Sequence, residues 1–226
     1  MENKLNYAAF NQEVANLVPL NAQVILDLGC GNGTMGEWLK NRQSCLVDGI
    51  TYSHEEAAIA DSILDTVWVG DLNVFDLTST GRQYDCIICS HVLEHLYEPW
   101  QVVQRLEAVL KPGGMLIVAV PNLLFWKQRW LLMCGNFKYS KAGGLLDITH
   151  YRFFDWQSVE ILYCDTTLLP VQKSATGMFP QPVIRKFFPA WSKRVDRWIV
   201  QQWPGLFGFQ FLMVHTRPKT GINGRQ

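Results

Sequence analysis

Val24-Ile-Leu-Asp-Leu-Gly-Cys-Gly-Asn-Gly33 is the stretch that decides the fold of this 226-residue chain. Its apolar first half predicts a buried strand over 24–28, and the glycines that follow predict a tight turn into a helix over 34–41. A glycine turn at a helix N-terminus lets a ligand lie against backbone N–H groups. The stretch therefore predicts a nucleotide-type binding site at the end of the first strand.

The same alternation of strand and helix continues outward from this stretch and predicts an α/β fold with a parallel sheet. A capping box formed by Ser53 and Glu56 starts one helix, and Lys111-Pro-Gly-Gly114 stops another. Further strands are predicted over 45–50, 66–69, 85–89, 115–120 and 208–215. Further helices are predicted over 6–17, 53–64 and 99–110, with another that Asp155 caps.

The composition is that of a chain with one sizeable core, with 48% apolar and 18% charged residues. Lys plus Arg and Asp plus Glu both number 20, so there is no overall preference for nucleic acid, and no nucleic-acid partner is expected. The charges are unevenly placed, because residues 1–172 hold 11 basic and 19 acidic side chains whereas residues 173–226 hold 9 and 1. An anion or an anionic surface would meet the C-terminal part.

Compartment signals point to the cytoplasm. The first residues lack the basic and apolar regions of a signal peptide, and the cleanest apolar run, 115–120, is far shorter than the ~20 residues of a membrane helix. Cys86 and Cys89 lie on a predicted strand whose positions i and i+3 face opposite sides. We interpret them as core thiols rather than a metal pair.

Asp27 separates two kinds of ligand for the glycine turn. Gly31-x-Gly33-x-x-Gly36 matches the dinucleotide fingerprint, and Asp48 lies near the distance expected of a ribose-binding acid. A carboxylate beside a pyrophosphate would be repelled, whereas one beside a sulfonium or amino group is favoured. Asp27 thus favours a ligand with an amine, and Asp48 is interpreted as a solvated charge at a strand end.

The quoted stretch resembles the first motif of class I S-adenosylmethionine-dependent methyltransferases, and further matching motifs follow in order. These are Gly49-Ile-Thr-Tyr-Ser53, Gly70-Asp-Leu72, Tyr84-Asp-Cys-Ile-Ile88 and Leu110-Lys-Pro-Gly-Gly-Met-Leu116. Ser90-His-Val-Leu-Glu-His-Leu96 and Leu146-Asp-Ile-Thr-His-Tyr-Arg-Phe-Phe154 resemble the MetW-like subgroup associated with surface glycans. The resemblance implies a Rossmann-like three-layer sandwich with a mostly parallel seven-stranded sheet, helices on both faces and a lid insertion after the fifth strand.

S-adenosyl-L-methionine is the cofactor that this resemblance implies, with its amine near Asp27 and its adenine amine near Asp71. The family commonly has an acid at the end of the second strand for the ribose hydroxyls, but this chain has Thr51, which binds more weakly. The end of the fourth strand would line the methionine portion. The full set of expected cofactor-binding residues is Asp27, Gly29, Cys30, Gly31, Gly33, Thr51, Asp71, Leu72, Ser90 and His91.

His95, His150 and Glu94 are the candidate catalytic residues. A histidine serves as a general base near neutral pH, and a carboxylate can orient it. With His91, the set also resembles the metal-binding pattern of small-RNA 2′-O-methyltransferases, so a divalent cation is an alternative to which the sequence does not commit. A purely structural role for Glu94 is the third interpretation. We expect His95 and His150 to meet on the acceptor side although they are 55 positions apart in the sequence.

Two segments stand apart from the regular alternation within a single domain over 1–226. The insertion at 122–150 carries Trp126 and Trp130, which predict a hydrophobic lid, a membrane-facing ridge or ordinary packing. The segment at 180–205 is basic and aromatic, with apolar residues at helical spacing and cations on the other side. It either rests peripherally on an anionic membrane, at the inner face, or packs on its own domain. The two helical sides are Trp191, Val195, Trp198, Ile199 and Gln202, and Lys193, Arg194, Arg197 and Gln201.

Methyl transfer to a hydroxyl is the function that these features favour. The expected acceptor is a small molecule or a sugar, such as a surface glycan, a nucleotide sugar or a lipid-linked saccharide, by analogy with the MetW-like subgroup. One alternative is a MetW-like accessory protein that binds the cofactor without acceptor chemistry of its own. Another is an NAD(P)-dependent oxidoreductase, against which Asp27 and the motif order argue.

Overall fold

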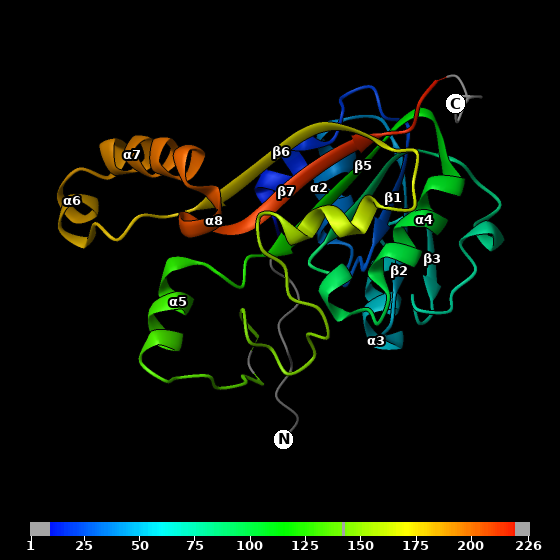
Figure 1. The fold of residues 1–226 in the computed structure, drawn as a ribbon. Helices are drawn as coiled ribbons and strands as arrows, with labels where there is room; N and C mark the ends of the chain where they lie inside the picture. Colours follow the sequence, from blue (N-terminus) through cyan, green and yellow to red (C-terminus); the bar gives the residue numbers. More distant parts are fainter. Residues whose placement is uncertain (1–9, 142, 220–226) are drawn as a thin grey trace, which may run out of the picture.

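The computed structural model describes residues 10–141 and 143–219, and within them seven strands form one sheet in the order β3-β2-β1-β4-β5-β7-β6 (Figure 1). The first five strands pair in parallel, and β7 runs antiparallel to both of its neighbours. This confirms the predicted Rossmann-like, mostly parallel sheet. The strands are β1 (Val24–Leu28), β2 (Leu46–Thr51), β3 (Thr66–Val69), β4 (Tyr84–Ser90), β5 (Leu110–Pro121), β6 (Leu169–Gly177) and β7 (Gly208–Thr216).

Helices cover both faces of the sheet because each strand presents apolar side chains alternately to either side. One face packs against α1 (Gln12–Leu17), α2 (Thr34–Arg42) and α3 (His54–Ala60). The other packs against α4 (Pro99–Val109), the 3₁₀ turn η1 (Leu77–Thr80) and the 3₁₀ turn η3 (Ser158–Tyr163). Two separate hydrophobic clusters result, one on each side of the sheet.

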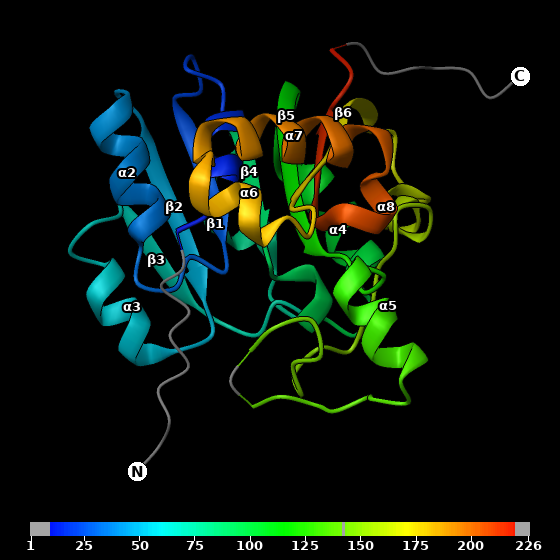
Figure 2. The same ribbon diagram turned by 90° about the vertical axis from the view of Figure 1, so that its left-hand side faces the viewer.

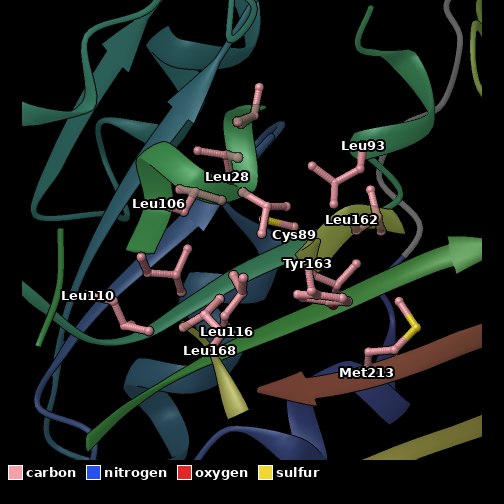
Figure 3. Close-up of a cluster of buried hydrophobic side chains, with 14 of the residues drawn as sticks. Leu28, Cys89, Leu93, Leu106, Leu110, Leu116, Leu162, Tyr163, Leu168 and Met213 are labelled. Atoms are coloured by element: carbon pink, nitrogen blue, oxygen red, sulfur yellow. The ribbon is translucent and has the colours of Figure 1, made fainter. Parts of the chain in front are cut away.

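The cluster under α4 and η3 is the larger of the two (Figure 3). Leu28, Leu116 and Met213 reach it from the sheet, while Leu106 and Leu162 reach it from the covering elements. Cys89 belongs to this cluster, whereas Cys86 belongs to the cluster on the opposite face. The interpretation of both cysteines as core thiols is therefore confirmed, and both are unbridged.

Several predicted boundaries are corrected. The helix predicted over 53–64 ends at Ala60, because the chain then turns to bring Leu64 into the core beside Gly36. The helix capped by Asp155 is the 3₁₀ turn η3, although Asp155 does accept hydrogen bonds at its start. The predicted start of the first helix, 6–9, lies outside the described residues. Strand β6 went unpredicted because it is an edge strand with exposed or half-buried side chains throughout.

The insertion after β5 contains α5 (Trp126–Met133) and a loop that returns to the sheet where Phe154 bridges Asn122. A second excursion joins β6 to β7 through α6 (Pro182–Phe187), α7 (Pro189–Gln202) and α8 (Pro204–Phe207). Figures 1 and 2 show that α5 and α6–α8 project from the same side of the molecule. Among the helices of the described part, none has both the length and the apolar content to cross a membrane.

The amphipathic pattern predicted for 180–205 is correct in kind but wrong in its faces. Ser192, Asp196 and Ile199 form the buried side of α7, whereas Trp191 and Trp198 are exposed to solvent. Asp196 is buried because it pairs with Arg185 and accepts a hydrogen bond from the backbone N–H of Phe179. A polar anchor, rather than the tryptophans, thus attaches this helix to its own chain.

Candidate active site

A cavity of about 460 Å³ opens at the carboxyl ends of β1, β2, β3 and β4. Ligands of open α/β sheets bind at this edge. The end of the insertion contributes Thr149 to the wall, and Tyr151 follows directly after it. The lining residues are Gly29, Gly31, Thr51, Tyr52, Ser53, Glu56, Gly70, Asp71, Leu72, Asn73, His91, Val92, His95, Leu96, Tyr97, Thr149 and Tyr151.

Glycine is required in the floor of this cavity. Gly29, Gly31 and Gly33 all have positive φ angles, of 76°, 52° and 83°, in the region that side chains disfavour. A Cβ atom on Gly29 would also meet Cγ2 of Val92 at 2.3 Å. The turn therefore exposes backbone to the cavity before α2 begins at Thr34, as the sequence predicted.

Asp27 lies near the end of β1, just below this floor. Its side chain is 4% exposed, and among the described residues its carboxylate has no hydrogen-bond partner. Burial raises the pKa of Asp27 to about 7. A buried carboxylate without a protein partner is chemically suited to a cation supplied from outside the chain.

Thr51 lines the cavity, but its hydroxyl is already engaged, since Oγ1 donates to Oε2 of Glu56 at 2.7 Å. Glu56 was assigned only to the capping box, in which Ser53 Oγ does accept from the Glu56 N–H. The carboxylate instead lies in the cavity wall beside the end of β2. Glu56 thus places a carboxylate next to Thr51, at the end of β2, where the family commonly has an acid. The sequence signal for this role was the position of Glu56, five residues after Thr51 on the following helix.

The third-strand motif forms a tight turn against the cavity. Oδ1 of Asp71 accepts from the backbone N–H and from Nδ2 of Asn73, at 2.9 and 2.8 Å. Asp71, Leu72 and Asn73 all line the cavity. The backbone carbonyl of Leu72 accepts from Arg105, which fixes the turn to α4. Asp71 is therefore both a turn former and a wall residue.

Asp48 lies away from this cavity, and its interpretation as a solvated charge is wrong. Its side chain is fully buried and accepts hydrogen bonds from Arg82 at 3.1 Å and from the Tyr84 hydroxyl at 3.1 Å. Strand geometry explains the difference, because Asp48 and Thr51 are three positions apart and face opposite sides. Asp48, the acid that would bind the ribose of a dinucleotide, is thus already hydrogen-bonded to Arg82 and Tyr84 away from the cavity.

His91 holds the end of β4 to the distant β7. Its φ of 57° is the one positive value among described non-glycine residues. Nε2 lies 2.7 Å from Oε1 of Gln210, and Nδ1 lies 3.2 Å from Oε1 of Glu94. Although burial lowers the pKa of His91, the contact with Glu94 outweighs it and raises that pKa. Ser90 accepts a weak hydrogen bond from Asn11 at 3.4 Å and joins the same network.

His95 and His150 converge as expected, with ring centroids 4.7 Å apart. Glu94 completes the group, and ligand atoms of the three side chains lie within 4.8 Å of one another. Oε2 of Glu94 is buried and has no hydrogen-bond partner within residues 10–141 and 143–219. The backbone carbonyl of Glu94 accepts from the N–H groups of Tyr151 and Arg152, so this turn also anchors the end of the insertion.

The tautomer of His95 follows from its neighbours. Nδ1 lies 3.2 Å from the carbonyl oxygen of Thr149, which can only accept, so Nδ1 carries the hydrogen. The Thr149 hydroxyl donates to Oδ1 of Asp147 at 2.8 Å and lies 3.0 Å from the same Nδ1. Asp147 is buried, and hydrogen bonds from Thr149 outweigh that burial and lower its pKa. The proton-accepting lone pair of His95 is therefore on Nε2.

His150 is held in the same tautomer, because its Nδ1 lies 3.3 Å from the carbonyl oxygen of Leu145. Burial lowers the pKa of His150, and the neighbouring His95 lowers it further. An imidazole with a lowered pKa is neutral at pH 7. The ring that packs against His95 is therefore a neutral imidazole.

The predicted site residues divide into two groups. The cavity wall includes Gly29, Gly31, Thr51, Asp71, Leu72, His91 and His95. Around it, without lining it, lie Asp27, Cys30, Gly33, Ser90, Glu94 and His150. The side chain of Cys30 turns away into the core beneath Gly49, so that its assignment to the cofactor stays a prediction. Ten further wall residues were not assigned from the sequence: Tyr52, Ser53, Glu56, Gly70, Asn73, Val92, Leu96, Tyr97, Thr149 and Tyr151.

Comparison with known proteins shows the family of the chain and its fold. Residues 3–161 match a family described as "Methyltransferase domain". The "Ubiquinone biosynthesis O-methyltransferase" of Haemophilus ducreyi is 28% identical over 194 residues, which cover 81% of this chain and 80% of the relative. The protein of that name from Coxiella burnetii is 27% identical, but the match covers only 48% of this chain and 47% of the relative. An S-adenosylmethionine-dependent methyltransferase from Mesorhizobium loti shares the fold, with a TM-score of 0.60, 16% identity and coverage of 91% and 96%.

Proposed function

Because the chain belongs to the methyltransferase-domain family and takes S-adenosylmethionine as its cofactor, we propose that it methylates a hydroxyl group of a small molecule bound above His95. The observation that carries this proposal is the orientation of His95, whose proton-accepting Nε2 belongs to a residue of the cavity wall. The relatives that carry the name of an O-methyltransferase support an oxygen acceptor.

The residues around the cavity fit the cofactor. The floor at Gly29 and Gly31 leaves room where a side chain would otherwise stand, and Asp27 offers a carboxylate to the cofactor's amine. We assign Glu56, supported by Thr51, to the ribose hydroxyls, because a carboxylate forms stronger hydrogen bonds than a hydroxyl. We assign Asp71 and Leu72 to the adenine, and Ser90 and His91 to the methionine portion. When bound, the cofactor supplies an electrophilic methyl group on a sulfonium.

The chain's own contribution is to position the acceptor and to remove its proton. Positioning accounts for most of the acceleration in a displacement of this kind. His95 accepts the hydroxyl proton at Nε2, and the Nδ1–H to Thr149 keeps the ring in that orientation as it becomes charged. The Thr149 hydroxyl lies between His95 and Asp147, and through it the Asp147 carboxylate stabilises the resulting imidazolium.

Glu94 and His150 act around this base. The buried carboxylate of Glu94 lies beside His95, and the ring of neutral His150 packs edge-on against the His95 ring. The same three residues also have the composition of a divalent cation site. Our assignment requires no metal, so activity is expected to persist in a chelator.

The mouth of the cavity favours a flat acceptor. The rings of Tyr97 and Tyr151 lie 4.5 Å apart at the wall, and Tyr52 is 80% exposed beside them. Aromatic walls stack on ring-shaped ligands. We place a phenolic hydroxyl first, in line with relatives named for ubiquinone biosynthesis. A sugar, which also stacks on tyrosine, is the second candidate, as the MetW-like resemblance implies.

Transfer of labelled methyl groups from S-adenosylmethionine to a panel of catechols and nucleotide sugars tests the proposal. The wild-type chain is expected to label at least one catechol. His95→Ala should lower kcat by roughly 100-fold while the Kd for the cofactor stays the same. His54→Ala is the matched control, because His54 is an exposed histidine outside the cavity wall.

Three results would contradict parts of this proposal. Labelling of nucleotide sugars alone would replace the phenolic acceptor with a sugar. Activity that EDTA abolishes and Mg²⁺ restores would assign Glu94, His95 and His150 to a cation instead. Cofactor binding without labelling of any acceptor would favour the accessory role.

A further inference from the structure

An aromatic and basic surface lies on the excursion between β6 and β7, apart from the cavity. Five large aromatic side chains of α6–α8 and their junctions are exposed by half or more. They are Phe187 (66%), Phe188 (65%), Trp191 (55%), Trp198 (57%) and Trp203 (52%). Together with the exposed cations Lys193, Arg194 and Arg197, they form what we call the aromatic–basic face.

Helix α7 shows that this exposure is built into the fold. Its inner side is fixed by Asp196, which pairs with Arg185 at 2.9 Å, and by Ile199 and Val200, which are buried. At 100° per residue, Trp191 and Trp198 fall on the opposite side of the helix. The tryptophans therefore point away from the chain that carries them.

The charge of this face has one sign. Among residues 173–226 the single acid is Asp196, which is buried and already paired. Lys193, Arg194 and Arg197 form no ion pair with any residue of the described part of the chain. Their charges are thus available to an anionic partner.

Helix α5 extends the face, since both views show it projecting from the same side as α6–α8 (Figures 1 and 2). It exposes Trp130 (62%) and Met133 (80%). Nη2 of Arg129 donates to the carbonyl oxygen of Gly205 at 3.2 Å, so α5 and α8 are tied to each other. The two excursions are therefore joined and lie on the same side of the molecule.

We propose that the aromatic–basic face, extended by α5, is a peripheral membrane-binding surface that docks on bilayers containing anionic phospholipid. Tryptophan rings favour the headgroup region, where one side of the ring meets acyl chains and the other meets water. By the same helical rotation Arg194 lies beside Trp198, whereas Lys193 and Arg197 lie toward the edge of α7, where they line a second cavity with Asp196. In the docked state these cations meet lipid phosphates around the inserted rings. A protein partner would need acids spread among apolar side chains, whereas an anionic bilayer offers both features everywhere. This proposal is independent of the methylated substrate.

Sedimentation of the full chain with phosphatidylcholine vesicles, with and without phosphatidylglycerol, tests the proposal. The wild-type chain is expected to pellet with the anionic vesicles and to be released as salt rises. The triple variant Lys193→Gln, Arg194→Gln, Arg197→Gln should bind roughly 100-fold more weakly. The double variant Trp191→Ser, Trp198→Ser should also lose binding to the anionic vesicles.

Matched controls separate this surface from a general loss of structure. Arg194→Lys with Arg197→Lys keeps the charge and should keep the binding. Leu20→Ser with Val74→Ser removes two exposed apolar side chains (74% and 79% exposed) elsewhere and should also keep it. The cofactor Kd should be equal in all variants, which shows that each is folded.

Three outcomes would overturn the proposal. The first is equal sedimentation of the wild-type chain with and without anionic lipid, and the second is equal binding by the wild-type chain and the triple variant. The third is self-association of the wild-type chain that the tryptophan variant abolishes while no vesicle binding occurs, which would make the face a contact between copies.

Discussion

Replacement of Asp27 by Asn should stabilise the protein and weaken its cofactor binding at the same time. Burial raises the pKa of this carboxyl from 3.8 to about 7 in the folded chain. The folded state therefore binds the proton more tightly than the unfolded state. As a result, the free energy of unfolding of the wild-type chain falls as pH rises from about 4 to about 7.

The magnitude follows from the size of the shift. A difference of about three pKa units corresponds to about 4 kcal/mol, the full cost of ionising Asp27 in the folded chain above pH 7. At pH 5.5 roughly half of that cost is present, because only the unfolded carboxyl has ionised. Asn has no charge to bury, so Asp27→Asn should be more stable by about 4 kcal/mol at pH 8 and by about 2 kcal/mol at pH 5.5.

Urea unfolding of the wild-type chain and Asp27→Asn at both pH values measures this difference, without and with S-adenosylmethionine. The bound amine should remove most of the advantage of the variant at pH 8, because it gives the wild-type carboxylate a cationic partner. A variant that is no more stable than wild type at pH 8, or a difference that does not change with pH, would refute the reasoning.

Other substitutions test separate parts of the structure. Glu56→Gln should raise the cofactor Kd roughly 10-fold in calorimetry, because it weakens a hydrogen bond to a charged group, and an unchanged Kd would remove Glu56 from the ribose site. Gly29→Ala should cost about 1–3 kcal/mol in urea unfolding, since its Cβ meets Val92 at a disfavoured φ, and a neutral effect would mean that the turn is free to shift. Arg82→Ala should cost about 2 kcal/mol by leaving buried Asp48 unpaired, and adding Asp48→Asn should recover most of this loss. A double variant as unstable as the single one would contradict that explanation.

The parallel part of the fold could be predicted because its strands are buried on both faces. Val24–Leu28 and Tyr84–Ser90 are nearly continuous apolar runs with glycine or polar punctuation, which a sequence displays directly. Strand β6 could not be predicted in this way. It lies at the sheet edge with Gln172, Lys173 and Ser174 in its middle, and only its pairing with β7 makes it a strand.

The candidate site was predictable where one segment supplies it, as in the turn from Asp27 to Gly33. A residue's role was not predictable where it depends on whether the fold directs its side chain into the cavity, into the core or to solvent. Glu56 is one example, because a capping-box acid is ordinarily turned back to its own helix. Asp48 is the other example. Its burial depends on an ion pair with Arg82, which lies 34 residues away in the sequence, and no residue near Asp48 predicts that pairing.

Calorimetric titration of the chain with S-adenosylmethionine, S-adenosylhomocysteine and NAD tests the central claim most directly. If the cavity above Gly29 is the cofactor site, both sulfur ligands bind with one site per chain. Asp27→Asn then weakens both, because each carries the amine that faces Asp27. Tighter binding of NAD than of either sulfur ligand, or equal binding of the sulfur ligands to the wild-type chain and Asp27→Asn, would contradict the account.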